Sequence, residues 1–182
     1  MQSQNLYFLA IIPNGKTAGE VTALKEHMAL HYNSRKALRV MPHITLKAPF
    51  TALQDKVVGW FEHLNLKTTP FLQTLDGFGA FANKHNPVIY VKPVASAHLT
   101  ALQGEITASF KHTFPEVALQ PTEEQFSPHM TIGYRDLSFE MFEKAWAEFE
   151  SKNYHAEFEV NEVFLLEHDG KKWNSIAQKP LQ

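Results

Sequence analysis

Cysteine is absent from all 182 residues of this chain. Without thiols the protein has no disulfide framework, no thiolate zinc site, no iron–sulfur cluster and no cysteine nucleophile. The lack of cysteine also fits a reducing compartment. Histidine, in contrast, is abundant, with ten residues in all.

An excess of positive charge is also lacking. The chain has 17 Lys and Arg against 19 Asp and Glu, which gives a formal net charge of −2 at pH 7. A protein that holds long nucleic acid by its phosphates normally carries a basic excess, so we expect no such partner. A small anionic ligand remains feasible, because a few local charges suffice to bind it.

Long hydrophobic runs are missing as well. No stretch approaches the roughly 18 consecutive apolar residues of a transmembrane helix. The apolar run at residues 6–12 has no positive segment before it and is followed by Pro13-Asn14-Gly15, so it predicts a buried strand and a turn instead of a targeting segment. We expect a soluble, cytoplasmic protein with no membrane partner.

The remaining composition is typical of a globular protein. Apolar residues make up 44% of the chain and no Gly/Ser linker divides it, so we expect a single domain over residues 1–182, acting as a monomer. Hydrophobic spacing predicts helices at 17–32, 53–66, 96–114 and 139–152. Strands are predicted at 6–13, in the part of 39–47 that starts at or after Pro42, and at 71–81, 88–94 and 129–134. A polar connector is predicted at 121–127. The chain is predicted to close with a hairpin of strands 158–167 and 172–178 around Asp169-Gly170. This order indicates an α+β fold with mainly antiparallel sheet, in two similar halves.

The most informative feature is a duplicated pentapeptide. Residues 42–46 read Pro-His-Ile-Thr-Leu and residues 128–132 read Pro-His-Met-Thr-Ile, with the two histidines 86 positions apart. The full pattern is expected by chance only about 0.01 times per chain of this composition, so two copies are meaningful. His98-Leu99-Thr100 matches only the central tripeptide and lies in a predicted helix, where positions i and i+2 do not share a face, so we interpret it as a chance match.

Strand geometry gives the pentapeptides a chemical meaning. Residues i and i+2 of a strand point to the same face, so His43 lies beside Thr45 and His129 beside Thr131. Two such strands facing each other would form a pocket with two imidazoles and two hydroxyl groups. One neutral and one protonated histidine can act as general base and general acid near neutral pH, and threonine hydroxyls can donate to phosphate oxygens.

This double motif resembles that of the 2H phosphoesterase superfamily, which includes bacterial and archaeal 2'-5' RNA ligases and RNA 2',3'-cyclic phosphodiesterases. The resemblance covers nearly the whole chain, from the opening strand to the closing hairpin. It implies two pseudo-symmetric lobes of antiparallel sheet with packed helices around a central cleft. It also implies that no metal and no cofactor is required.

The resemblance further assigns roles to the matching positions. His43 and His129 would be the acid–base pair, and Thr45 and Thr131 would hold the substrate phosphate. The reaction would be in-line attack on phosphorus. Because the family more commonly opens 2',3'-cyclic phosphates to 2'-phosphates, His43 is expected to be the base and His129 the acid.

Several further side chains are candidates for substrate binding. Lys47 and Arg135 continue the alternation of the two motifs, so they either place positive charge at the rim of the cleft or are solvated charges at strand ends. Phe50, Phe81 and Tyr134 either stack on a nucleotide base or belong to the core.

Other residues have simpler interpretations. Gly133 either allows a close approach by a ligand or backbone or marks a bend in the strand. Trp60, Trp146 and Trp173 are predicted to be core residues. His27 and His31 lie four residues apart on one predicted helix and are either an adventitious metal pair or helix surface.

Three functions follow from these patterns. The first is a metal-independent phosphodiesterase that hydrolyses a 2',3'-cyclic phosphate or a 2'-5'-linked nucleotide or RNA end. The second is an RNA 2'-5' ligase or another RNA-end processing enzyme. The third is a non-catalytic nucleotide- or RNA-binding module that keeps the cleft without the chemistry. In each, the partner is a small nucleotide or an RNA end.

Overall fold

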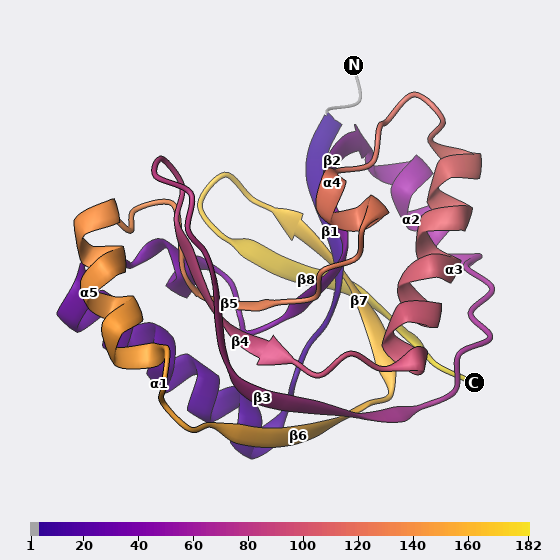
Figure 1. The fold of residues 1–182 in the computed structure, drawn as a ribbon. Helices are drawn as coiled ribbons and strands as arrows, with labels where there is room; N and C mark the ends of the chain where they lie inside the picture. The colour runs from indigo at the N-terminus through magenta and orange to yellow at the C-terminus, as the bar shows by residue number, and fades with distance from the viewer. Residues whose placement is uncertain (1–3) are drawn as a thin grey trace.

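Two antiparallel sheets form the framework of the molecule in a computed structural model that describes residues 4–182 (Figure 1). Within these residues there are eight strands, five α-helices and one short 3-10 helix. Each sheet has four strands. The predicted α+β class with antiparallel sheets is therefore confirmed.

The first sheet contains the N-terminal strand at an inner position. Its strand order is β2 (Ile44–Leu53), β1 (Gln4–Ile11), β7 (Glu162–His168) and β8 (Trp173–Pro180). The second sheet has the order β5 (Met130–Gly133), β4 (Val88–Pro93), β3 (Phe71–Phe81) and β6 (His155–Val160). Each motif threonine lies on an edge strand, β2 or β5, and these two strands contact each other.

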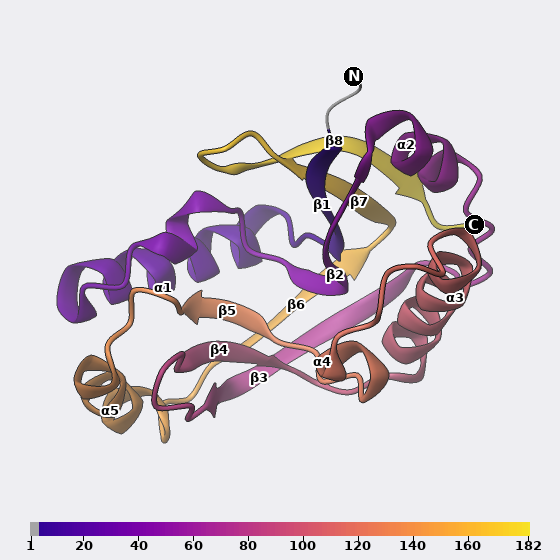
Figure 2. The ribbon, with the colours of Figure 1, turned by 90° about the horizontal axis from the view of Figure 1, so that it is seen from above.

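Two helices each pack against the sheet that does not contain the strand before them. Helix α1 (Gly15–Tyr32) follows β1 in sequence but packs against β5 and β6 of the second sheet, next to α5 (Phe139–Phe149). Helix α3 (Ala97–Thr113) follows β4 but packs against β2, while α2 (Gln54–Glu62) contacts β2 and β8. Figure 2 shows α1 and α5 on one side of the molecule and α2 and α3 on the other. Each sheet is thus covered in part by a helix that follows a strand of the other sheet.

A continuous hydrophobic core joins the two sheets. One cluster of buried side chains includes Leu9 and Ile44 from the first sheet and Ile89 and Met130 from the second. Strand β1 is buried on both faces, which is the reason for its unbroken apolar sequence: alternate residues such as Phe8 belong to a second, smaller cluster.

Several element boundaries differ from the predicted ones. The helix predicted for 53–66 ends at Glu62, and β2 starts after Pro42 but continues to Leu53. The predicted strand 158–167 is wrong: its first part belongs to β6, which pairs with β3, and its second part is β7, which pairs with β1 and β8. Apolar alternation is similar in both parts, so only the break at Asn161 separates the sheets.

The connections agree with the turn signals in the sequence. Strands β7 and β8 form the predicted hairpin around Asp169-Gly170, and Gly170 has the left-handed φ of 92° that this turn requires. The predicted connector 121–127 contains a one-turn helix, α4 (Pro121–Glu124), and a 3-10 turn, η1 (Lys36–Arg39), precedes β2. Across residues 4–182, no helix has the length and apolar character needed to cross a membrane.

Gly79 on β3 provides a test of the packing of the second sheet. It lies opposite Tyr90 on β4, and an added Cβ would overlap the Tyr90 ring, with the phenolic oxygen only 2.6 Å away. We expect Gly79→Ala to lower the free energy of unfolding by about 1–3 kcal/mol in urea denaturation. Gly104→Ala at an exposed position of helix α3, where an added Cβ meets nothing within 4 Å, should raise it by about 0.5–1 kcal/mol. Equal stability of the two variants would contradict this packing.

Candidate active site

The two histidines of the repeated motif meet in one cleft between the sheets. His43 immediately precedes β2, and His129 immediately precedes β5. Both line a cleft of about 380 Å³, together with Thr45 and Thr131. The structure thus brings together the four residues that the sequence singled out. The cleft is also lined by Phe8, Lys25, Ala37, Val40, Pro49, Asn86, Val88, Tyr134, Arg135 and Trp173.

A one-residue bulge follows the threonine of each motif. On β2, Thr45 lies opposite Ala10 of β1, but Lys47 lies opposite Leu9, so the register shifts by one residue between them. On β5, Thr131 lies opposite Tyr90, and Gly133 lies opposite Ile89 with the same shift. An extra residue reverses the alternation of side chains beyond it. The position two residues beyond each threonine, Lys47 or Gly133, therefore turns away from the face that carries the motif.

Lys47 is consequently a core residue. Its side chain is 1% exposed, and its ammonium group lies 2.9 Å from the Glu123 carboxylate and donates to the Ala48 carbonyl at 3.0 Å. The expectation that Lys47 places charge at the rim is wrong because the bulge turns it towards the Leu9 face of the sheet. Phe50 is likewise 3% exposed and packs on Phe110, so the stacking interpretation of Phe50 is wrong as well.

The residues after the second motif divide between core and cleft. Gly133 faces Met28 of α1, whose terminal methyl group lies 2.6 Å from the position of an added Cβ, so the close approach comes from a helix side chain. Arg135 adopts a left-handed φ of 60° and lines the cleft with Tyr134, over whose ring its guanidinium group lies at 5.4 Å. Phe81 packs edge-on against the His129 ring, with centroids 5.2 Å apart.

Backbone carbonyls hold the two imidazoles in equivalent orientations. His43 Nδ1 lies 2.9 Å from the Met41 carbonyl, and His129 Nδ1 lies 2.8 Å from the Ser127 carbonyl. A carbonyl only accepts hydrogen bonds, so each Nδ1 must carry the hydrogen. In the neutral ring Nε2 then carries the lone pair, which is the form required of a general base.

Burial favours the neutral form of both histidines. The pKa of His43 is lowered to about 4, mainly by desolvation and in smaller part by the positive charges of Lys25 and His129, while the hydrogen bond to Met41 opposes the shift. Desolvation also lowers the pKa of His129, opposed by its hydrogen bond to Ser127. An anion in the cleft would raise both pKa values, because it stabilises the charged ring.

Lys25 is a cleft residue that the sequence analysis missed. Its side chain on α1 is only 1% exposed, and its ammonium group donates to the carbonyls of Ala37 at 3.1 Å and Val40 at 2.9 Å. Burial lowers its pKa to about 8. Lys25 follows Val21 and precedes Met28 on the buried face of α1. A lysine on an otherwise apolar helix face was the signal that could have identified it.

Trp173 also lies in the cleft, although a core position was predicted. It is half-buried and packs edge-on against Phe8, which in turn contacts the His43 ring with centroids 5.0 Å apart. Trp60, in contrast, is buried in the core, and Trp146 packs against it, as predicted.

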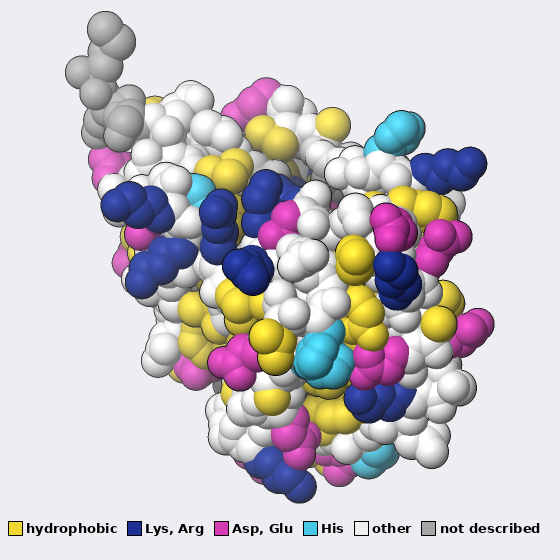
Figure 3. Space-filling view, turned by 90° about the vertical axis from the view of Figure 1, so that its left-hand side faces the viewer, with side chains coloured by type: hydrophobic (Ala, Val, Ile, Leu, Met, Phe, Trp, Pro, Cys, Tyr) yellow, Lys and Arg dark blue, Asp and Glu magenta, His cyan; other side chains and the backbone are white. Residues whose placement is uncertain are grey.

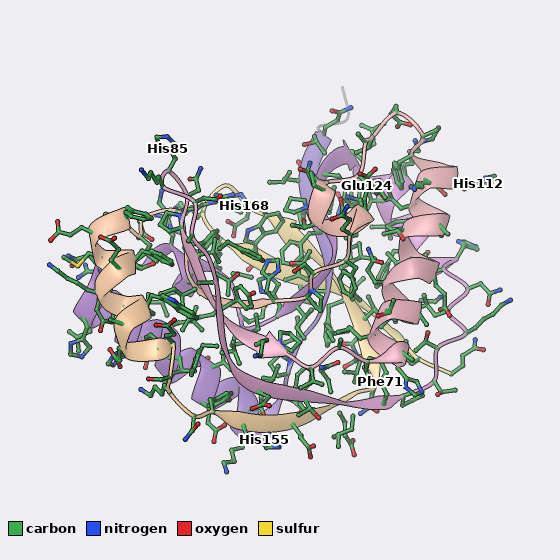
Figure 4. All side chains as sticks on the ribbon, viewed as in Figure 1. Phe71, His85, His112, Glu124, His155 and His168 are labelled. Atoms are coloured by element: carbon green, nitrogen blue, oxygen red, sulfur yellow. The ribbon has the colours of Figure 1, made fainter. Side chains whose placement is uncertain are left out.

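None of the other eight histidines lines the cleft, although the His168 ring packs on Trp173. Figure 4 shows His85, His112 and His155 at the periphery of the molecule. His27 bonds to Glu148, with Nε2 3.1 Å from Oε2, and its ring packs on His31. In the described part of the chain, no group of three or more His, Asp or Glu side chains is arranged to hold a metal ion.

The pKa of His43 gives a direct test of the cleft electrostatics. We expect its NMR titration midpoint at about pH 4 in the free protein, moving upward when inorganic phosphate is added. Because its pKa is lower in the folded than in the unfolded state, where it is about 6.5, the unfolded state binds more protons in this window. The free energy of unfolding should therefore fall as the pH drops from about 6.5 towards 4, and less steeply in His43→Ala. A midpoint near 6.5 would contradict the buried, neutral ring.

The ion pair of Lys47 offers a second test. Lys47→Met leaves the buried Glu123 carboxylate without its counter-ion, so we expect the free energy of unfolding to fall by about 3–5 kcal/mol in urea denaturation. The matched control is Lys56→Met, which removes an exposed pair with Glu116 and should change stability little. If both variants are equally stable, Lys47 does not have the structural role assigned to it.

Comparison with known proteins places the chain in a family. The sequence matches the model of the 2'-5' RNA ligase superfamily over residues 13–172. A Bacillus cytotoxicus protein named "Putative phosphoesterase" is 30% identical over 170 residues, which cover 91% of each chain. A Bacillus thuringiensis protein of the same name is 33% identical over 128 residues, which cover 69% of this chain and 67% of that one.

Solved structures share the fold. E. coli LigT in complex with 3'-AMP has a TM-score of 0.69 at 16% identity, with 99% of both chains covered. TT0787 of Thermus thermophilus has a TM-score of 0.67 at 16% identity, with 97% of both chains covered. At these identities the likeness establishes the architecture, and the family match extends over most of the sequence. The chain therefore belongs to the 2'-5' RNA ligase superfamily of 2H phosphoesterases.

Proposed function

We propose that the cleft hydrolyses a phosphodiester, either a 2',3'-cyclic phosphate or a 2'-5' linkage, on a small nucleotide or an RNA end. The observation that carries this proposal is the equivalent environment of His43 and His129. Both rings line one cleft, and in both a backbone carbonyl fixes the hydrogen on Nδ1 and leaves Nε2 for proton transfer. General acid–base catalysis needs two such groups, one to accept a proton and one to donate it.

In the proposed reaction, His43 Nε2 takes a proton from a water molecule as the water oxygen attacks phosphorus. The bond between phosphorus and the leaving ribose oxygen breaks, and protonated His129 gives its Nε2 proton to that oxygen. One proton enters the pair and one leaves, so the two histidines end with exchanged protonation states. The assignment of His43 as the base is supported by its low pKa, which keeps it neutral before attack.

The remaining cleft residues suit a phosphate ligand. The hydroxyl groups of Thr45 and Thr131 can donate to the non-bridging oxygens, and Lys25 and Arg135 supply positive charge. No Asp or Glu is among the described residues that line this cleft. The imidazolium form of His129 would be stabilised by the bound anion itself.

The ligands of a structural relative support a nucleotide substrate. E. coli LigT has been crystallised with 3'-AMP, ATP and NADP+. We propose that this chain likewise takes a small nucleotide or RNA end, as a monomer and with no metal or other cofactor. A second candidate, RNA 2'-5' ligation, is favoured by the family model that the sequence matches. In ligation an RNA 5'-hydroxyl group takes the place of the attacking water: its oxygen bonds to the phosphorus of a 2',3'-cyclic phosphate and its proton goes to one histidine. The bond from phosphorus to the ribose 3'-oxygen breaks, and that oxygen takes a proton from the other histidine. A non-catalytic binding module is the third candidate.

The test is an assay of 2',3'-cyclic and 2'-5'-linked nucleotides in the presence of a chelator. We expect turnover by the wild type, and a loss of about 10²–10⁴ in kcat for His43→Ala and for His129→Ala. Thr45→Val and Thr131→Val should each lose about 10²–10³, because each removes a donor to the developing charge.

The matched control is His98→Ala, which changes the chance copy of the tripeptide on α3 and should keep full activity. Absence of cleavage, or full activity in the His43 and His129 variants, would contradict hydrolysis at this site. Joining of RNA ends with 2',3'-cyclic phosphate and 5'-hydroxyl groups would identify the ligase. Nucleotide binding without either reaction would identify a binding module.

A further inference from the structure

A second depression adjoins the active cleft. It has a volume of about 260 Å³, and Lys25, Val40 and Trp173 line both it and the cleft. The side chains that line only the depression include Arg39, at the end of η1, and Lys172, in the turn between β7 and β8. A ligand in the cleft can therefore continue past Trp173 into the depression.

Lys25 carries a buried charge that lacks an anionic partner. Its ammonium group has three hydrogens, of which two are donated to the Ala37 and Val40 carbonyls. No ion pair of Lys25 with a carboxylate is found within the described residues. A buried cation without a counter-ion is costly, so an anion bound beside it is stabilised.

Arg39 and Lys172 also have no carboxylate at ion-pair distance within residues 4–182, although the charge of Lys172 helps to lower the pKa of the nearby Asp169 carboxyl. Both side chains are exposed, and neither forms an ion pair within 4.0 Å. The nearby Asp169 carboxylate accepts hydrogen bonds from the backbone N–H groups of Lys171 and Lys172 and from the Asn174 side chain, so it is occupied within the turn. Figure 3, which shows the left-hand side of the view in Figure 1, has Lys and Arg side chains gathered at its upper left.

We propose that the depression binds a second phosphate group of the substrate, held by Arg39 and Lys172 with Lys25 beneath them. This inference rests on the proposed function, because it assumes that the scissile phosphate lies between His43 and His129. The cleft and the depression share three lining residues and are therefore neighbours. We accordingly place the two phosphates on one nucleotide, on either side of its ribose. The substrate is then a nucleotide that carries a 5'-phosphate, either as a terminal monoester or as the diester link to a preceding nucleotide.

The experiment compares ligands that differ by one phosphate. Isothermal titration calorimetry measures the affinities of 3'-AMP and adenosine 3',5'-bisphosphate for the wild type, for Arg39→Ala/Lys172→Ala, and for the matched control Lys67→Ala/Lys111→Ala. The control removes two exposed cations elsewhere and gives the same net charge. In the wild type we expect the bisphosphate to bind about tenfold more tightly than 3'-AMP. This ratio should fall to about one in Arg39→Ala/Lys172→Ala and stay unchanged in the control.

A dinucleotide with a 3'-phosphate and a 5'-hydroxyl group distinguishes the two sources of the second phosphate. If the dinucleotide binds more tightly than 3'-AMP and the difference depends on Arg39 and Lys172, the subsite is supported and the second phosphate is a diester. If only the bisphosphate binds more tightly than 3'-AMP, the subsite is supported and the second phosphate is a terminal monoester. If 3'-AMP binds but the bisphosphate is no tighter, or if the ratio survives in Arg39→Ala/Lys172→Ala, the subsite is overturned and the proposed function stands. If neither 3'-AMP nor the bisphosphate binds, the subsite is overturned, whereas the proposed function is decided by the cleavage assay, because its expected product is the 2'-phosphate.

Discussion

The hydrogen bonds from His43 Nδ1 to the Met41 carbonyl and from His129 Nδ1 to the Ser127 carbonyl determine what the cleft can do. Each carbonyl lies two residues before its histidine, in the segment that leads into an edge strand. The same short segment therefore positions the ring and selects its tautomer. Burial then keeps both rings neutral until an anion arrives. Proton transfer in the proposed reaction depends on these two local arrangements being equivalent.

The rest of the fold holds these segments at a fixed separation. Strands β2 and β5 belong to different sheets, and the crossing of α1 and α3 between the sheets places both in one continuous core. The buried pair of Lys47 and Glu123 adds a direct link between β2 and the connector that leads to His129, since Glu123 also accepts from the Ala48 N–H at 2.8 Å. The buried ion pair thus joins the two motif segments inside the core. The cations that line the cleft, in contrast, are available to an anionic ligand.

The sequence alone predicted that the four motif residues meet in one cleft, because the information that marks them is local. A repeated Pro-His-x-Thr pattern marks both segments, and period-two alternation places His43 with Thr45. It failed beyond the first threonine, at Lys47, because a bulge depends on pairing with a neighbouring strand and leaves no pattern in its own strand. The split of 158–167 between two sheets was hidden for the same reason.

Lys25 and Trp173 were missed for a different reason. Both are far in sequence from the motifs and reach the cleft only through the packing of α1 and β8. Local patterns carry no information on such distant contacts. The cation of Lys25 and the ring of Trp173 nevertheless line both the active cleft and the neighbouring depression, where the proposed second phosphate would bind.

A crystal structure of the protein with a nucleoside 2'-monophosphate bound tests the central claim most directly. The account predicts the phosphate between the two rings, with its oxygens about 2.6–3.2 Å from Nε2 of both His43 and His129 and hydrogen-bonded to the hydroxyl groups of Thr45 and Thr131. A phosphate bound elsewhere, or histidine rings that offer Nδ1 to the ligand, would contradict it.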